Sequence, residues 1–275
     1  TVEELLKCVC VSSGNDAAVA LAEKVSGVTE LFVEQMNNRA RGLGMEDTHF
    51  ANPTGLTAEG HVTSAYDIAV MSRELLTKHP EIREFSTIWM DSIRGGAFQL
   101  ANTNKLLRRY DGATGLKTGY TASAGYCISA TAEREGMELI AVVMKGETAD
   151  KRNADAKTLL DYGFSAYTLV SAVPEEPLPT LPVAMGEGDS AALTLPEDGV
   201  TAVMEKAKAG ALERRLDLPE TLKAPVAQGQ QVGTLTLCSG GQEVLSVPVL
   251  AAEDVPGRSW GRMFTELLHR AAFLA

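Results

Sequence analysis

Apolar residues recur at helical spacing through the first part of the chain. The opening segment TVEELLKCVCV follows this spacing, and Thr1 and Glu4 stand where a capping box places its two members. A chain that opens on such a helix is expected to have further sequence before it. Three more amphipathic helices are predicted, with N-caps at Asn15, Thr29 and Ser64.

From residue 87 the pattern changes to short β-like runs. TIWMDSI and AFQLANT flank Arg94-Gly95-Gly96, and two longer runs, AGYCISATAE and MELIAVVMK, flank the turn at 134–136. The segment DKRNADAKTLLDYGF then predicts a helix. Helices combined with adjacent antiparallel strands indicate an α+β domain, in which one sheet is covered by helices.

Composition shifts near residue 173, where VPEEPLPTLPV carries four prolines and predicts an extended linker or edge strand. Beyond it, short β-like runs bounded by Gly, Pro or Asp indicate a small all-β domain. The last stretch returns to helical spacing. We therefore expect a first domain over 1–167, a β-rich domain over 168–255 and a C-terminal amphipathic helix over 256–275.

The C-terminal helix combines an apolar face with basic residues and is too short to span a bilayer, which suits a membrane surface. The alternative is a helix docked on its own domain or on another chain. The apolar positions are Trp260, Met263, Phe264, Leu267, Leu268, Ala271 and Leu274, and the basic ones are Arg258, Arg262 and Arg270.

Charge and composition narrow the function classes. The 25 basic and 36 acidic residues give a net charge of -11, so nucleic acid is not an expected partner. Four cysteines, at positions 8, 10, 127 and 238, and four histidines show no metal-ligand spacing, and we expect no cofactor. We expect buried thiols, while a disulfide between distant cysteines stays open.

Two short motifs are the candidates for chemistry. One is Ser13-Gly14-Asn15 at the end of the first helix, and the other is Lys117-Thr118-Gly119 in a β-like run. Taken alone, each has a structural explanation, as helix caps and as the beginning of an edge strand. In this order they match the S-x-N and K-T-G elements of penicillin-binding proteins and serine β-lactamases.

The resemblance extends beyond the two motifs. The stretches SSGNDAAVALAE, MNNRARGLGMEDTHFANPTGL, GATGLKTGYTASAGYCISATA and LIAVVMKGE resemble the D-alanyl-D-alanine carboxypeptidases of the low-molecular-weight penicillin-binding group, almost continuously over residues 1 to 165. This implies a transpeptidase/β-lactamase-like domain. The region after residue 165 resembles the C-terminal domain of those enzymes less specifically.

The resemblance implies a role for each motif residue. Ser13 relays a proton toward the departing amine, and Asn15 orients the substrate's peptide group. Lys117 supplies positive charge near the nucleophile and the substrate carboxylate. These roles require the two motifs to face each other across one groove.

The same resemblance implies substrate-binding residues. Thr118 hydrogen-bonds the substrate carboxylate, Gly119 lets the substrate lie close as an added strand, and the backbone N–H of Tyr120 forms half of an oxyanion hole. Arg152 stands where the family places an arginine that binds the terminal carboxylate. Its neighbour Lys151 competes for that role, and the alternative for Arg152 is an exposed basic residue that opens a helix.

The sequence departs from the family at the nucleophile. The family's Ser-x-x-Lys motif lies several dozen residues before S-x-N, but only twelve residues precede Ser13, and no serine here has a lysine three positions later. The first strands of the sheet and the helix bearing the nucleophile are therefore expected to be missing. A fragment of a normal carboxypeptidase is the favoured explanation, and a naturally shortened homologue is the other. We expect this chain to react with a penicillin only when upstream sequence is restored.

The predicted function is that of a serine-type D-Ala-D-Ala carboxypeptidase. Its expected partners are the peptidoglycan pentapeptide, β-lactam antibiotics and a membrane surface, and its expected location is the outer face of the cell membrane. A β-lactamase-like hydrolase is one alternative, although no deacylating carboxylate can be placed in the sequence. A non-catalytic cell-wall binding protein is the other.

Overall fold

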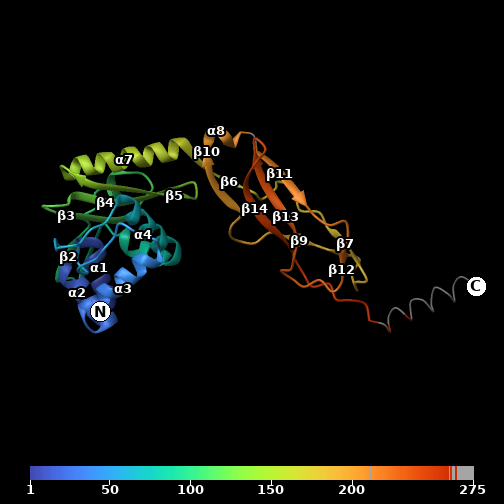
Figure 1. The fold of residues 1–275 in the computed structure, drawn as a ribbon, viewed down its shortest axis with the longest axis horizontal. Coiled ribbons are helices and arrows are strands. Elements are labelled where there is room, and N and C mark those ends of the chain that lie inside the picture. Colours follow the sequence, from blue (N-terminus) through green and yellow to red (C-terminus); the bar gives the residue numbers. More distant parts are fainter. Residues whose placement is uncertain (211, 260, 262–263, 265–275) are drawn as a thin grey trace, which may run out of the picture. The chain divides into compact units, whose positions relative to one another are not determined.

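The computed structural model describes residues 1–210, 212–259, 261 and 264, and it divides into two compact units, Thr1–Ser165 and Ala166–Ala275 (Figure 1). The first combines helices with an antiparallel sheet, and the second is built mainly from strands. The observed fold is therefore mixed α+β followed by a β-rich unit.

Four helices open the first unit: α1 (Val2–Ser12), α2 (Asn15–Ser26), α3 (Thr29–Gly42) and α4 (Ala65–Lys78). The capping box at Thr1 is confirmed, since its hydroxyl accepts from the N–H of Glu4. The cap at Ser64 is also confirmed, because its hydroxyl accepts from the N–H of Asp67.

The predicted caps at Asn15 and Thr29 are wrong by one position. Each is the first residue of its helix, and the preceding residues, Gly14 and Val28, are the caps. Both cap residues have extended backbone, and the structure shows no side-chain capping bond at either helix. Backbone conformation at the preceding residue, rather than side-chain type, decides where these helices begin.

Three strands, β3 (Ala113–Thr121), β4 (Gly125–Arg134) and β5 (Met137–Gly146), form a sheet in the order β3-β4-β5. Alternate residues of β4 face opposite sides. Ile128 packs with Ala156 of α7 (Ala149–Ala166), whereas Ser129 bonds Ser72 of α4, and Figure 1 shows these two helices on opposite faces of the sheet. The predicted helix-covered antiparallel sheet is confirmed.

Shorter elements complete the first unit. The hairpin of β1 (Met90–Ile93) and β2 (Phe98–Ala101) confirms the turn predicted at Arg94-Gly95-Gly96, and buried Leu100 packs with Val11 at the end of α1. The remaining short helices are η1 (Pro80–Ile82), α5 (Arg83–Ser86) and α6 (Leu106–Arg109).

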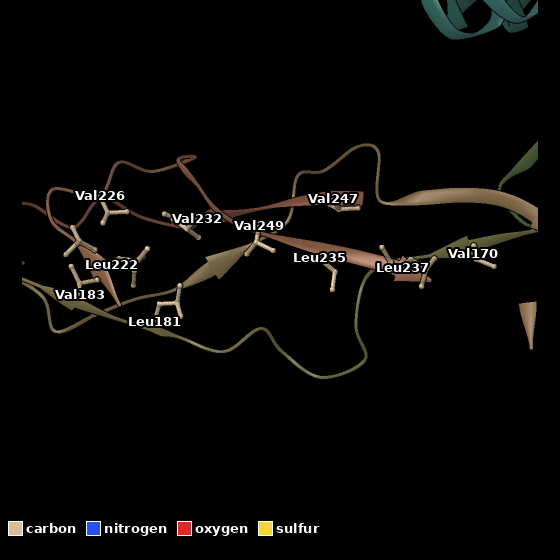
Figure 2. Close-up of a cluster of buried hydrophobic side chains, with 14 of the residues drawn as sticks. Val170, Leu181, Val183, Leu222, Val226, Val232, Leu235, Leu237, Val247 and Val249 are labelled. Atoms are coloured by element: carbon tan, nitrogen blue, oxygen red, sulfur yellow. The ribbon is translucent and has the colours of Figure 1, made fainter. Parts of the chain in front are cut away.

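The second unit surrounds one apolar core (Figure 2). Valines and leucines on alternate positions of its longest strands point inward, as the β-like runs predict. A four-stranded sheet has the order β11-β13-β14-β9, a three-stranded sheet the order β12-β7-β8, and β6 pairs with β10. The elements are β6 (Tyr167–Ser171), β7 (Leu181–Ala184), β8 (Ser190–Ala191), β9 (Leu193–Thr194), β10 (Thr201–Glu205), α8 (Lys206–Ala209), β11 (Leu212–Asp217), β12 (Leu222–Lys223), β13 (Gln231–Ser239) and β14 (Gln242–Ala251).

The helix predicted over 256–275 lies outside the described residues, apart from 256–259, 261 and 264. Within that part, Arg258 donates from Nε to the carbonyl oxygen of Gly186 at 2.6 Å, and its Nη2 lies 3.1 Å from a carboxylate oxygen of Asp189. Arg258 thus binds its own unit. Over the described part of the chain, no helix has the length and apolarity needed to cross a bilayer.

All four cysteines are described, and all are free thiols. Cys238 is buried, whereas the other three are partly buried. The prediction of buried thiols therefore holds fully only for Cys238, and the disulfide left open by the sequence is not formed.

Candidate active site

Ser13 lies at the turn between α1 and α2. It is exposed, and its backbone takes the left-handed conformation, with φ of 61° and ψ of 43°. This conformation is uncommon for a residue with a side chain and reverses the chain after α1. Gly14 closes the turn by donating its N–H to the carbonyl of Cys8 at 3.0 Å. The turn therefore presents Ser13 at the surface on a defined backbone.

Lys117 meets Ser13 directly. Its Nζ donates to Ser13 Oγ at 2.9 Å, although the two residues are 104 positions apart, and it also donates to the carbonyl of Thr118 at 2.7 Å. The two motifs that the sequence singles out therefore lie together. Lys117 stands in the middle of β3 rather than at the head of the strand, because the strand begins at Ala113 and pairs with β4 from there.

Burial lowers the pKa of Lys117 from 10.5 to about 8. The neighbouring thiol of Cys10 opposes this shift, and the positive charge of Arg152 adds to it. A buried ammonium group pays a desolvation penalty, so its charged form is disfavoured. At neutral pH this lysine is charged yet much closer to losing a proton than an ordinary lysine, which suits a group that passes protons to a hydroxyl.

Asn15 is exposed and lies two residues after Ser13. Asn15 is the first residue of α2 and not its N-cap, and the described structure shows no side-chain capping bond at the start of this helix. Its amide is accessible to a ligand beside Ser13. An amide that both donates and accepts can hold a peptide group in one orientation.

Thr118 and Gly119 lie on the end strand of the described sheet. Thr118 is 8% exposed, and its hydroxyl lies 2.6 Å from the hydroxyl of Thr103. An ideal Cβ on Gly119 would meet no atom within 4 Å, so open space adjoins the strand there. Among the described strands β3 pairs only with β4, so its other edge has no strand partner, and beside Gly119 this edge suits an extended peptide.

Tyr120 is 60% exposed and stacks on Tyr126, its cross-strand partner, with ring centroids 4.4 Å apart. The ring therefore lies on the strand surface just beyond Gly119. The role expected for Tyr120 involves its backbone N–H only, and the ring contact is an additional feature of this chain.

Arg152 is only 5% exposed, although it lies in the first turn of α7. Its guanidinium donates to the carbonyl of Cys127 at 3.3 Å and to the side chain of Asn153, and burial lowers its pKa. Cys127 is the cross-strand partner of Gly119, so Arg152 lies close to the motif on β3. No carboxylate among the described residues pairs with Arg152, which leaves this cation suited to an anionic ligand.

Lys151 behaves differently from its neighbour. It is exposed and forms an ion pair with Glu147 one turn earlier. Between the two basic residues that the sequence leaves in competition, Arg152 is the one directed into the protein near β3. The alternative considered for Arg152, an exposed basic residue that opens a helix, fits Lys151 instead.

The segment Asn102–Thr103–Asn104 was not predicted as part of the site. The sequence indicates only the end of a strand there, yet this segment contacts both α1 and β3. Two asparagines separated by one residue after a strand are a signal for side-chain bonding to nearby backbone. That signal does not specify which backbone groups they contact.

Two models of known protein families match this chain. The family model described as D-alanyl-D-alanine carboxypeptidase matches residues 1–148, and that of the penicillin-binding protein 5 C-terminal domain matches residues 168–257. The D-alanyl-D-alanine carboxypeptidase DacF of Bacillus subtilis (strain 168) is 39% identical over 259 residues, which are 93% of this chain and 66% of DacF. The chain thus spans about two thirds of that relative's length.

Solved structures give the same result. Penicillin binding protein 5 from Haemophilus influenzae shares 30% identity and a TM-score of 0.72, over 93% of this chain and 75% of that one. Penicillin-Binding Protein D2 from Listeria monocytogenes, in its cefotaxime-bound form, shares 38% identity and a TM-score of 0.56, over 60% of this chain and 66% of that one. Since the first family model alone covers more than half of the sequence, this chain belongs to the D-alanyl-D-alanine carboxypeptidase family of penicillin-binding proteins.

Proposed function

We propose that the full-length gene product is a serine-type carboxypeptidase that removes the terminal D-alanine from peptidoglycan stem pentapeptides. One observation carries the proposal: the ammonium group of Lys117, whose pKa falls to about 8, donates to Ser13 Oγ at 2.9 Å beside an open strand edge. A lysine and a serine hydroxyl in this contact form a short proton-transfer path.

In the proposed reaction, a serine hydroxyl attacks the carbonyl between the two D-alanines and forms an acyl-enzyme. The family resemblance assigns that hydroxyl to a Ser-x-x-Lys motif, which this sequence does not contain. The departing D-alanine amine takes a proton from Ser13 Oγ, and Ser13 regains one from Lys117. The proton that the attacking hydroxyl releases replaces the one given up by Lys117, so the relay ends in its starting state. Water then hydrolyses the acyl ester and regenerates the attacking serine.

The remaining residues hold the substrate. We assign the terminal carboxylate to Arg152 and Thr118, because a buried guanidinium without a carboxylate partner in the described structure favours an anion. The peptide backbone would lie along β3 beside Gly119, where a side chain is absent and space is open. Asn15 orients the scissile peptide group, and the Tyr120 N–H contributes to the oxyanion hole.

The same site is proposed to react with β-lactam antibiotics, since these mimic an acylating peptide. The cefotaxime-bound form of the Listeria monocytogenes relative supports this assignment. Because peptidoglycan lies outside the cytoplasmic membrane, we place the activity on its outer face. A membrane contact through residues 256–275 is part of the proposal and rests on the sequence pattern alone.

The test uses the full-length gene product and two peptides that differ only in their final residue, D-Ala-D-Ala and D-Ala-L-Ala. We expect release of free D-alanine from the first peptide and no cleavage of the second. We also expect a fluorescent penicillin to label the protein covalently and to be released slowly. Rapid multiple-turnover hydrolysis of penicillin would favour a β-lactamase. A protein that neither cleaves the D-Ala-D-Ala peptide nor is labelled by penicillin would favour a non-catalytic binding protein.

A further inference from the structure

We propose that Asn104, together with its neighbour Thr103, is a positioning element that sets the spacing between Ser13 and Lys117. This inference rests on the proposed function of that site. Neither residue is hydrogen-bonded to Ser13 or Lys117 in the described structure. They act through backbone carbonyls of α1 and β3, and Thr103 also acts through the hydroxyl of Thr118.

Thr103 attaches the segment to the end of α1. Its backbone N–H donates to the carbonyl of Val11 at 3.1 Å, and Val11 is fully buried two residues before Ser13. The last turn of α1 leaves its carbonyl groups without helical partners, so an external donor is needed there. Thr103 supplies that donor at the point where the chain turns toward Ser13.

Asn104 attaches the same segment to β3. Its side-chain Nδ2 donates to the carbonyl of Gly115 at 2.8 Å, two residues before Lys117. Asn104 is 1% exposed, and its Oδ1 accepts from the N–H of Leu106 at 3.0 Å. A buried amide with donor and acceptor both satisfied holds one orientation, because any other orientation would leave a buried polar group unpaired.

The two attachments are made by consecutive residues. Adjacent Cα atoms stay about 3.8 Å apart, so the contacts to α1 and to β3 cannot drift independently. The segment is itself anchored, since the Asn102 side chain donates to the carbonyl of Ile88 at 2.8 Å and its backbone N–H to that of Trp89 at 2.8 Å. A rigid bridge therefore joins the two motif-bearing elements.

The bridge also reaches the substrate-binding side of β3. The hydroxyl of Thr103 lies 2.6 Å from that of Thr118, and Thr103 is exposed. Because one of these hydroxyls donates to the other, the hydroxyl of Thr118 has a restricted orientation. Displacing reacting groups by about 1 Å can reduce a rate by roughly 100-fold, so a bridge of this kind has kinetic consequences.

The first test compares Asn104→Ala with Asn37→Ala in the full-length gene product. Asn37 is a matched control, because its side chain also makes backbone bonds, to Val33 and Phe50, but these join α3 to a loop and not α1 to β3. We expect Asn104→Ala to lower kcat for D-alanine release by about 10- to 100-fold, with a smaller change in KM. Asn37→Ala should have the kcat of the wild type. Equal kcat in both variants, measured where both are folded, would overturn the proposal.

A second comparison uses hydroxyl pairs. Thr103→Val removes the bond to Thr118, and Thr63→Val removes the equivalent 2.8 Å pair between Thr63 and Thr48. We expect a smaller fall in kcat/KM for Thr103→Val, about 10-fold, with recovery in Thr103→Ser and no change for Thr63→Val. A loss that Thr103→Ser does not restore would contradict a positioning role.

A readout without catalysis separates this inference from the proposed function. Crystal structures of Asn104→Ala and Thr103→Val report the Lys117 Nζ to Ser13 Oγ distance and the Thr118 rotamer, whether or not the wild type releases D-alanine. We expect the distance to exceed 3.5 Å, the limit for a hydrogen bond, in Asn104→Ala, and a rotated Thr118 hydroxyl in Thr103→Val. If the Lys117–Ser13 distance and the Thr118 rotamer are unchanged in both variants, the positioning role of Thr103 and Asn104 is refuted. If the variants show the altered geometry but the wild type releases no D-alanine, only the proposed carboxypeptidase function is refuted.

Discussion

The two units bury different kinds of side chain. In the second unit the described core is made of valines, leucines, alanines and one methionine (Figure 2). The first unit contains every buried polar side chain found among the described residues: Asp67, Ser72, Ser86, Asn102, Asn104, Thr118, Ser129, Thr131, Arg152 and Asn153.

This difference shows which part of the molecule requires side chains in fixed geometry. A buried polar group destabilises a fold unless it is hydrogen-bonded, so it persists only where partners are supplied in fixed geometry. In the first unit these partners connect α4, α7 and the segment 102–104 to strands β3 and β4, beside Lys117. In the second unit the core of the described residues is held by apolar burial, which is non-directional.

Truncating the apolar core should produce the largest loss of stability. Leu237 is fully buried in the second unit, whereas Val203 in the same unit is 52% exposed. We expect Leu237→Ala to lower the free energy of unfolding by about 2–5 kcal/mol and Val203→Ala to change it little. Calorimetry of the full-length protein measures both. Below its melting temperature, Leu237→Ala should still release D-alanine. Loss of this activity in the folded variant would contradict the view that the apolar core of the second unit does not hold the site in the first.

The partly buried Lys117 should make stability depend on pH. Its folded pKa is about 8 against an ordinary 10.5, so between these values the unfolded chain binds more protons and stability rises with pH. The gain is at most about 3 kcal/mol. Lys117→Met should lack this rise.

The measurement is denaturant unfolding across that pH window in a Cys10→Ser background, because burial raises the pKa of the Cys10 thiol and it is coupled to Lys117. Lys24, which is exposed on α2, provides the control variant Lys24→Met. Parallel pH curves for wild type and Lys117→Met would show that Lys117 is not a desolvated cation.

The adjacent residues Arg152 and Lys151 should separate substrate binding from surface charge. Arg152→Met removes a buried guanidinium, and Lys151→Met removes an exposed ammonium one position away. We expect Arg152→Met to raise KM for a D-Ala-D-Ala peptide by about 10- to 100-fold. For the same peptide with a C-terminal amide in place of the carboxylate, KM should change little, because that group carries no charge for Arg152 to bind. Lys151→Met should leave KM unchanged. Similar KM values for the two variants would remove Arg152 from the carboxylate site.

The smallest effect should come from a buried hydroxyl pair outside the site. Ser72 and Ser129 lie 2.8 Å apart between α4 and β4. Each single alanine variant leaves one buried hydroxyl without its partner, so we expect a coupling energy of about 1 kcal/mol in a double-mutant cycle. A cycle with no coupling would show that the polar face of β4 is not held by pairing.

Local signals predicted much of the fold. The alternation in AGYCISATAE predicts a strand, and Ile128, Ala130 and Ala132 do face the α7 side of the sheet. The opposite face reads as polar and would be assigned to solvent, yet Ser129 is buried because α4 covers it. The covering residue, Ser72, is 57 positions away. No local pattern contains that contact.

The candidate site divides in the same way. The two motifs are visible because they consist of side chains with recognisable chemistry at known spacing. Asn104 was missed because its partner is the backbone carbonyl of Gly115, and a carbonyl is present at every residue. Likewise, side-chain type does not reveal that Arg152 is buried and Lys151 exposed, since this depends on how α7 is rotated against β4.

The most direct test of the account is the acylation rate of the full-length gene product by a fluorescent penicillin, compared between Lys117→Met and Lys24→Met. If the contact between Lys117 and Ser13 is the proton path of a carboxypeptidase, Lys117→Met should be labelled at least about 100-fold more slowly while Lys24→Met matches the wild type. Equal labelling rates in all three proteins would contradict the central claim.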